Sequence, residues 1–522
     1  MVNPMKSMKT VFAMMIALVL VLGTVSASAC TAIYVGSDLT EDGSTLFARS
    51  EDYSNSYAKV MYVSPAGEYK AGEAYKGCYG FEYVWEKDSY SFTTFSDDNW
   101  EGSQNICPDC GETHKHNPYG AGGTNEMGVS MSATETLYCS VDAVYDLDPF
   151  TDKGIEEAEI VTVVLSQAAT AKEGVDILLG IYDSVGCNNG SGIFIADNTE
   201  TWYIENLTGT QYVAVKLSSS VAFANPNQNV IGLIDLDDTE NVIASANLIA
   251  IAKQAGTFVG NEEENQIDYQ ASYNGEEGVS ARMVDALNFM YGTTDKTAET
   301  ITPADYTISN VDENGAIVPF HSNIALTHKY DVSDIVAYYH IPSIGKAGNT
   351  ETHIFQIFAE DSKADTVEWV SMDHAGYSPF VPFLPMLTSD TEACYKASCA
   401  PAVFTQEEPA EGWYYKTTGR IRTAEGRVTV DGFKVLPENW ENSLYWAMDA
   451  LSNAVESGKF TEEQIAEVNT EMAALQEKCY TVYDLLMSSA NSEEAAALCT
   501  MHSNTMAANV HEAALKLLEG IQ

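Results

Sequence analysis

Basic residues are scarce in this chain. Its 522 residues include 26 lysines and arginines against 75 aspartates and glutamates, so the formal net charge at pH 7 is −49. Such an acidic surface repels the phosphate backbone of nucleic acids and anionic membrane surfaces. The composition therefore excludes a nucleic-acid-binding protein, whereas 45% hydrophobic and 10% aromatic residues are typical of a folded globular chain.

Long apolar segments are also missing after residue 29, so no stable membrane span is expected. Residues 1–29 contain the parts of a secretory signal, namely Lys6 and Lys9, an apolar run over residues 11–22, and an Ala-Ser-Ala cleavage site ending at Ala29. The apolar run is shorter than the roughly 20 residues that cross a bilayer. We therefore interpret residues 1–29 as a signal peptide and predict a secreted or cell-surface protein.

Cleavage after Ala29 would make Cys30 the first residue of the mature chain. Three interpretations are open: an incidental cysteine, a lipidated cysteine, or an N-terminal nucleophile whose own α-amine serves as the base. Lipidation normally requires a leucine-like residue where Ala27 stands. An α-amine with a pKa of about 7.7–8.0 and a thiol with a pKa of about 8.5 suit the third interpretation near neutral pH.

The residues after Cys30 predict an antiparallel hairpin. Residues 31–35 and 44–48 have the β-branched and aromatic content of strands, and residues 36–43 are turn-forming. A hairpin centred in that turn pairs positions whose numbers sum to about 79 and therefore places Arg49 opposite Cys30.

This hairpin gives two residues distinct electrostatic roles. A guanidinium beside the thiol favours the thiolate, and the carboxylate of Asp52 can hold the ammonium group of the chain terminus. The alternative is that Arg49 and Asp52 are surface residues at an exposed hairpin end.

Seven short motifs carry a resemblance to a known family. In this order they resemble the C69 dipeptidases, which are N-terminal-nucleophile cysteine peptidases related to penicillin V acylases and bile salt hydrolases. The motifs occupy residues 30–36, 42–44, 48–52, 124–136, 226–228, 234–238 and 377–383.

The resemblance implies an α+β protein with the four-layer αββα sandwich of the N-terminal-nucleophile hydrolases. We expect this core over residues 30–435. A C-terminal helical region is expected over residues 436–522, because alanine, glutamate and leucine dominate there. Four residues in it recur at helical spacing on one face: Leu444, Met448, Leu451 and Val455.

The resemblance also implies a set of catalytic residues. Cys30 would attack the peptide carbonyl with Arg49 and Asp52 beside it, and Asn125 and Asn227 would stabilise the oxyanion. For Asn125 the alternative is a turn residue, and Asn225 competes with Asn227 for the second oxyanion position. Arg282 resembles a further active-site arginine of the acylases.

The implied activity is hydrolysis of dipeptides through an acyl-enzyme, so the expected partners are small peptide substrates and no cofactor is expected. Two alternatives remain at this point. One is an amidase for N-acylated amino acids, of the bile salt or penicillin type. The other is a non-catalytic, lipid-anchored surface protein that binds peptides.

Ten cysteines in an exported chain predict disulfides, and nine remain when Cys30 is set aside. Cys394 with Cys399 and Cys479 with Cys499 are candidate pairs, although the sequence does not fix the connectivity. A separate group with C-x-x-C spacing predicts a disulfide or loop clip, a structural zinc site or free thiols. This group consists of Cys107, Cys110, His114 and His116.

Overall fold

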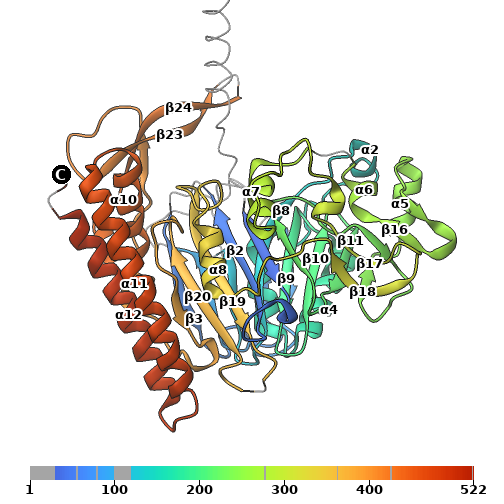
Figure 1. Ribbon diagram of the computed structural model, residues 1–522, viewed down its shortest axis with the longest axis horizontal. Coiled ribbons are helices and arrows are strands. Elements are labelled where there is room, and N and C mark those ends of the chain that lie inside the picture. The colour runs from blue at the N-terminus through green and yellow to red at the C-terminus, as the bar shows by residue number, and fades with distance from the viewer. Residues whose placement is uncertain are drawn as a thin grey trace, which may run out of the picture.

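Two β-sheets packed face to face form the centre of the protein (Figure 1). The computed structural model describes residues 30–53, 57–77, 80–98, 119–275, 278–360, 362–423, 426–519 and 521.

Sheet A, as we name the first sheet, has six antiparallel strands. In spatial order they are β12 (Ala222–Asn225), β1 (Thr31–Val35), β2 (Thr45–Asp52), β19 (Asn349–Ile357), β20 (Thr366–Met372) and β21 (Val381–Phe383). The chain thus returns 170 residues after the end of β2 (222 − 52) to place β12 beside β1, and 297 residues after it (349 − 52) to place β19 beside β2.

Sheet B, the second sheet, has eight strands. In spatial order they are β14 (Val242–Ala244), β11 (Tyr212–Lys216), β10 (Thr201–Asn206), β9 (Gly190–Ala196), β8 (Ser130–Leu137), β7 (Gly120–Thr124), β6 (Phe92–Asp97) and β3 (Lys59–Ser64).

Aromatic side chains fill much of the space between the two sheets. Alternate residues of a strand point to opposite faces, so Tyr34 of β1 and Phe47 of β2 face sheet B together. The Phe47 ring lies 5.3 Å from Phe194 of sheet B and 4.8 Å from Phe355 of the neighbouring strand β19. This aromatic cluster joins the two sheets into one core.

Helices cover the outer faces of both sheets. Helices α3 (Glu157–Gln167) and α4 (Ala171–Val185) pack on sheet B, where Thr170 caps α4 by accepting a hydrogen bond from the backbone N–H of Glu173. Helices α7 (Ala281–Met290) and α8 (Val332–Tyr339) pack on sheet A. The predicted four-layer αββα order is confirmed.

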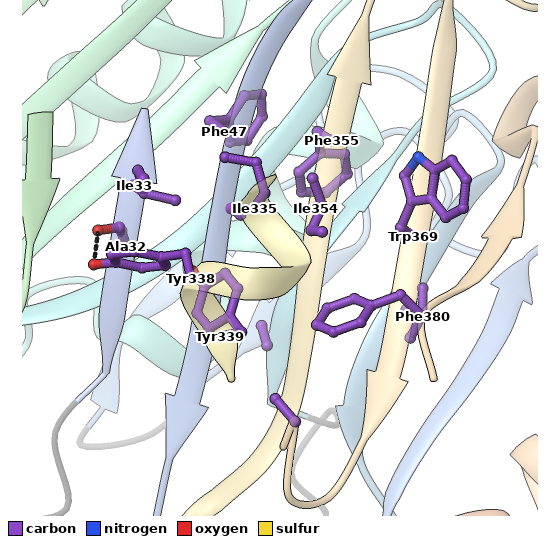
Figure 2. Close-up of a cluster of buried hydrophobic side chains, with 14 of the residues drawn as sticks. Ala32, Ile33, Phe47, Ile335, Tyr338, Tyr339, Ile354, Phe355, Trp369 and Phe380 are labelled. Carbon is purple, nitrogen blue, oxygen red and sulfur yellow. Dashed lines mark hydrogen bonds between the residues drawn. The ribbon is translucent and has the colours of Figure 1, made fainter. Parts of the chain in front are cut away.

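Helix α8 is held on sheet A by apolar and aromatic side chains. Figure 2 shows Ile335, Tyr338 and Tyr339 of this helix beside Ile33 and Ile354 of the sheet. The Tyr339 hydroxyl also donates a 2.9 Å hydrogen bond to the backbone carbonyl of Thr31. Strand β1 is therefore fixed from its outer face directly after Cys30.

Three C-terminal helices follow the sandwich: α10 (Leu444–Glu456), α11 (Glu462–Ser489) and α12 (Ala495–Leu518). The four residues predicted to share one face of α10 are all buried. Helices α11 and α12 lie against β21, where Ser503 donates to the backbone carbonyl of Pro382 at 2.8 Å and the Phe380 N–H donates to Gln476 at 2.8 Å.

The remaining elements connect these layers or extend them. A three-stranded sheet next to α10 contains β22 (Val403–Thr405), β23 (Tyr414–Thr423) and β24 (Gly426–Val435). The other strands are β4 (Ala74–Lys76), β5 (Glu82–Val84), β13 (Leu233–Asp235), β15 (Gly260–Asn261), β16 (Gln266–Asp268), β17 (Ile308–Val311) and β18 (Ile317–Ser322). The short helices are α2 (Asp142–Tyr145), α5 (Leu248–Ala255), α6 (Tyr269–Tyr273) and α9 (Ala393–Lys396).

Neither of the two candidate disulfides is formed in this structure. Cys394, Cys399, Cys479 and Cys499 all carry free, buried thiols. The Cys399 thiol donates a weak hydrogen bond to the carbonyl of Asn439, and the Cys499 thiol donates one to the carbonyl of Leu486. The group with C-x-x-C spacing lies outside the described residues. None of the helices within the described ranges is long and apolar enough to span a membrane.

Candidate active site

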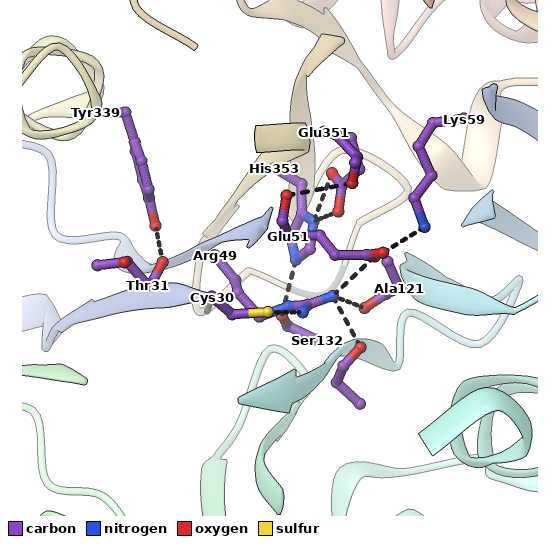
Figure 3. Close-up of polar contacts among 12 residues, drawn as sticks. Cys30, Thr31, Arg49, Glu51, Lys59, Ala121, Ser132, Tyr339, Glu351 and His353 are labelled. Atoms are coloured by element: carbon purple, nitrogen blue, oxygen red, sulfur yellow. Dashed lines mark hydrogen bonds and ion pairs between the residues drawn. The ribbon is translucent and has the colours of Figure 1, made fainter. Parts of the chain in front are cut away.

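Cys30 lies at one end of the space between the sheets. It directly precedes β1, and the residue is 7% exposed. Arg49 of β2 donates a hydrogen bond from Nη1 to the Cys30 sulfur at 3.2 Å (Figure 3). The structure therefore brings together the thiol and the guanidinium that the hairpin was expected to join.

The register that produces this contact differs from the predicted one. Ala32, not Cys30, pairs with Arg49, so paired positions sum to 81 and not 79. A shift of two residues preserves the face to which each side chain points, whereas a shift of one would reverse it. Arg49 therefore still faces Cys30 and reaches it along the strand direction with its long side chain.

Arg49 is a fully enclosed cation with a 1% exposed side chain. Its Nη2 donates to the carbonyls of Ala121 at 3.1 Å and Ala133 at 2.9 Å, and its Nε donates to the Ser132 hydroxyl at 3.3 Å. Burial alone would lower the pKa of Arg49, but the neighbouring Cys30, Tyr119, Glu51 and Glu351 raise it well above its usual value. The guanidinium therefore stays charged beside the thiol.

A second ionic group lies next to Arg49. Glu51, two residues further along β2, is 3.7 Å from Arg49 and 2.6 Å from Lys59, and Lys59 is 2.7 Å from Asp97. Burial raises the pKa of Glu51 to about 7, although Lys59 and Arg49 oppose the rise. These interactions neutralise part of the charge that the site buries.

Asp52 lies at the end of the same strand, and its carboxylate is held by the first residue of β19 and by a lysine that precedes this strand. Asn349 donates to Oδ1 at 2.6 Å, and the Lys346 ammonium is 2.9 Å from Oδ2. Strand alternation places Asp52 on the face opposite to Arg49 and Glu51. Its proposed contact with the amine of Cys30 stays a prediction.

Arg282, at the start of α7, contacts the backbone of Cys30. Its Nη1 donates to the Cys30 carbonyl and to the Thr31 hydroxyl (2.8 Å), and its Nη2 donates to the Pro226 carbonyl (3.1 Å) and to Asn227 Oδ1 (2.9 Å). Arg282 therefore connects Cys30, the predicted nucleophile, to the loop that carries the second predicted oxyanion residue.

Asn227 is the better of the two candidates in that loop. It adopts a left-handed backbone conformation (φ 63°), and its Nδ2 donates to the Thr136 carbonyl at 3.0 Å. Asn225 instead donates to the Tyr203 hydroxyl and accepts from the backbone N–H of Gln228, so it shapes the loop.

The oxyanion role predicted for Asn125 does not fit its geometry. Its Nδ2 donates to the carbonyls of Leu165 (2.9 Å) and Ala168 (2.7 Å) at the end of α3, and its Oδ1 accepts from the N–H groups of Met127 and Val129. Both amide hydrogens thus bind the helix layer outside sheet B, whereas Cys30 lies inside. Asn125 is a turn residue, the alternative considered above.

Comparison with known proteins decides the family. The model of peptidase family C69 matches residues 29–417. The chain belongs to peptidase family C69.

Among curated relatives, "Probable dipeptidase B" of Streptococcus pyogenes serotype M18 (strain MGAS8232) is 35% identical over 247 residues, 47% of this chain and 46% of that protein. "Probable dipeptidase" of Salmonella dublin is 31% identical over 257 residues, 49% of this chain and 55% of that protein. The matches thus span about half the length of these relatives.

Two solved structures are also similar to this C69 chain. Penicillin V acylase from Agrobacterium tumefaciens is 14% identical with a TM-score of 0.32, over 68% of this chain and 85% of that one. A mutant of the conjugated bile acid hydrolase from Clostridium perfringens is 12% identical with a TM-score of 0.27, over 66% and 89%.

The sequence alone did not assign several residues to the candidate site. Ser132, Glu351 and His353 surround Arg49 from strands far away in sequence, and Lys59 and Asp97 complete the ionic group. Glu51 had a local signal, because it stands two residues after Arg49 on the same strand face, and Ser132 lies within the motif at residues 124–136. Within the described part of the chain, no group of three histidine, cysteine, aspartate or glutamate residues could hold a metal ion.

Proposed function

We propose that this chain is a cysteine peptidase that hydrolyses dipeptides with Cys30 as its nucleophile. Its membership of family C69 and the names of its relatives support the peptidase class. The observation that carries the proposal is the 3.2 Å hydrogen bond from Arg49 to the Cys30 sulfur inside a buried site. A permanent cation at this distance favours the thiolate, which is the nucleophilic form of cysteine.

The proposed reaction uses one residue as both nucleophile and base. Removal of residues 1–29 during export frees the α-amine of Cys30, which takes the thiol proton as the sulfur attacks the peptide carbonyl. The same amine returns the proton to the leaving amino group and then activates the water that hydrolyses the acyl-enzyme. Asp52 would hold the charged amine.

In the proposed mechanism the oxyanion is stabilised by Asn227. Arg282 donates to Oδ1 of this amide and at the same time to the Cys30 carbonyl. These two contacts fix the amide relative to the nucleophile before substrate arrives, and such preorganised donors are effective because they do not reorient during the reaction.

The direct test is Cys30→Ser in the exported protein. A hydroxyl ionises far less readily than a thiol, so turnover should fall by orders of magnitude while the thermal unfolding profile stays unchanged. Hydrolysis is measured on a panel of dipeptides, longer peptides and acylated amino acids. Wild-type turnover in the Cys30→Ser variant would contradict the nucleophile assignment, and activity confined to acylated amino acids would favour the amidase.

Intact-mass analysis of the same protein tests the proposed processing. Cleavage after Ala29 leaves an unmodified Cys30, whereas lipidation adds the mass of a diacylglycerol. Enzyme that retains one extra residue before Cys30 should be nearly inactive although its thiol is present, because the amine has moved away. Full activity in that sample would show that another group is the base.

A further inference from the structure

A row of three side chains supports Arg49 on the side away from Cys30. Ser132 of sheet B lies 2.7 Å from Nε2 of His353, and Nδ1 of His353 lies 3.0 Å from Glu351 (Figure 3). Each of the three residues is at most 1% exposed. His353 pairs directly with Arg49 across β19 and β2, so this row connects both sheets behind the guanidinium.

The positions of the hydrogens in this row follow from the protonation states of His353 and Glu351. Burial lowers the pKa of His353, so its ring is neutral near pH 7. Burial alone would raise the pKa of Glu351, but the contact with His353 and the charges of Arg49 and Lys59 hold it below its usual value, so it is ionised. A carboxylate can only accept, so the ring hydrogen lies on Nδ1.

The position of this hydrogen fixes which atom donates and which accepts in the other two hydrogen bonds of the row. Nε2 of His353 accepts from the Ser132 hydroxyl, and the Ser132 oxygen is left to accept from Nε of Arg49. The ring is also fixed sterically. It stacks on Phe95 with centroids 5.2 Å apart, and a Cβ at Gly122 would come within 3.2 Å of Nε2.

We propose that Ser132, His353 and Glu351 are positioning residues that hold the Arg49 guanidinium against the Cys30 sulfur. The Ser132 hydroxyl is a neutral acceptor for Nε of Arg49. Ser132 and His353 stand between the guanidinium and the Glu351 carboxylate in this row. A carboxylate in direct contact would pair with Arg49 and weaken its attraction for the thiolate. This role rests on the proposed function of Cys30.

The row has the residue types of a nucleophile, a base and an orienting acid, but it serves Arg49. The Ser132 oxygen already accepts the Arg49 hydrogen bond, and its hydroxyl is buried. Cys30 is the thiol that Arg49 contacts. The row is therefore connected to the reaction only through the guanidinium.

The test compares Ser132→Ala with Ser130→Ala. Ser130 is a matched control, because it is a buried hydroxyl on the same face of β8 whose partner is the neutral Thr124 hydroxyl at 2.9 Å. The readout is the rate of Cys30 alkylation by iodoacetamide as a function of pH, with Cys30→Ser correcting for the other thiols. The other charged or titratable groups around this interior stay in place in both variants: Glu51, Lys59, Asp97, Tyr119 and Arg282.

We expect Ser132→Ala to move the alkylation midpoint upward by at least about half a pH unit, because a displaced guanidinium favours the thiolate less. Its kcat should fall on the order of tenfold with little change in KM, since misplaced catalytic groups affect rate more than binding. The Ser130→Ala midpoint should overlay the wild type.

Two outcomes would overturn the proposal: an unchanged midpoint in Ser132→Ala, or an equal shift in both serine variants. If Ser132→Ala does not fold, His353→Gln decides by the same midpoint, because an amide oxygen can replace Nε2 only imperfectly. Alkylation does not require peptidase activity. An inactive wild type that still shows the midpoint difference would therefore contradict the proposed function and leave the positioning role intact.

Discussion

Arg49 is an unusual residue because the protein buries its charge and aims it at a sulfur atom. Several donors of the guanidinium are satisfied by neutral groups, namely the carbonyls of Ala121 and Ala133 and the Ser132 hydroxyl. The carboxylate of Glu51 lies farther away, at 3.7 Å, and is shared with Lys59. Much of the positive charge therefore remains available to Cys30.

Removal of this charge should be visible in the thiol chemistry. We predict that Arg49→Ala moves the pH midpoint of Cys30 alkylation upward by about 1–3 units, the usual effect of an opposite charge within about 4–6 Å. The acid limb of the rate profile should move in the same direction. Lys70→Ala, which removes an exposed lysine paired with Asp88, is the control and should not move the midpoint. An Arg49→Ala curve that overlays the wild type would refute the electrostatic role.

At the scale of secondary structure, local sequence patterns predicted the elements better than their pairing. Strand β1 has the predicted bounds, and the helical face of α10 is buried as expected. The β1–β2 register was wrong because Ser37–Leu39 forms a 3-10 helix and Thr40 bridges to Tyr330, so the turn is not symmetric. Turn geometry of this kind depends on contacts distant in sequence.

The site was predictable only where its residues are local or belong to a motif. Cys30 and Arg49 come from one hairpin, and Asn227 and Arg282 came from the resemblance. Ser132 lies within the motif at residues 124–136, but its contact with His353 could not be predicted, because a contact across 221 residues has no local signal. Asn125 was misassigned because an asparagine that shapes a turn has the same sequence appearance as one that binds an oxyanion.

A buried carboxyl joins the two sheets and should make stability depend on pH. Glu368 of β20 accepts a 2.6 Å hydrogen bond from Thr93 of β6, and burial raises its pKa from 4.5 to about 7. Between these values the folded protein keeps a proton that the unfolded chain releases. The contribution of Glu368 to stability is therefore complete below pH 4.5 and is lost as the pH rises through 7.

We predict that Glu368→Gln removes this dependence. The free energy of unfolding of the wild type should fall relative to the variant by up to about 3 kcal/mol between pH 4.5 and 7.5, since one pKa unit corresponds to about 1.4 kcal/mol. Urea unfolding at several pH values measures the difference. A constant difference across this range would show that Glu368 titrates normally.

At the scale of the whole molecule, the net charge of −49 opposes the compact state, because like charges are closer together in the folded chain. Added salt screens exposed charges, with a Debye length of about 10 Å at 0.1 M, and affects buried ion pairs such as Lys59 with Glu51 much less. We predict that the Tm rises by a few degrees between about 20 and 300 mM sodium chloride. Potassium chloride at equal ionic strength should raise the Tm by the same amount. A fall in Tm with added salt would contradict the conclusion that repulsion between exposed acidic groups destabilises the folded chain.

Helices α11 and α12, which lie against β21, also block the addition of further strands to the edge of sheet A. β21 is the last strand of sheet A, and the final strand of any sheet can act as a template that recruits a further extended chain. Here Ser503 and Gln476 bind backbone groups at Pro382 and Phe380, and proline has no N–H to offer an incoming strand. Loss of the residues after 435 would thus open this edge to strand addition and self-association.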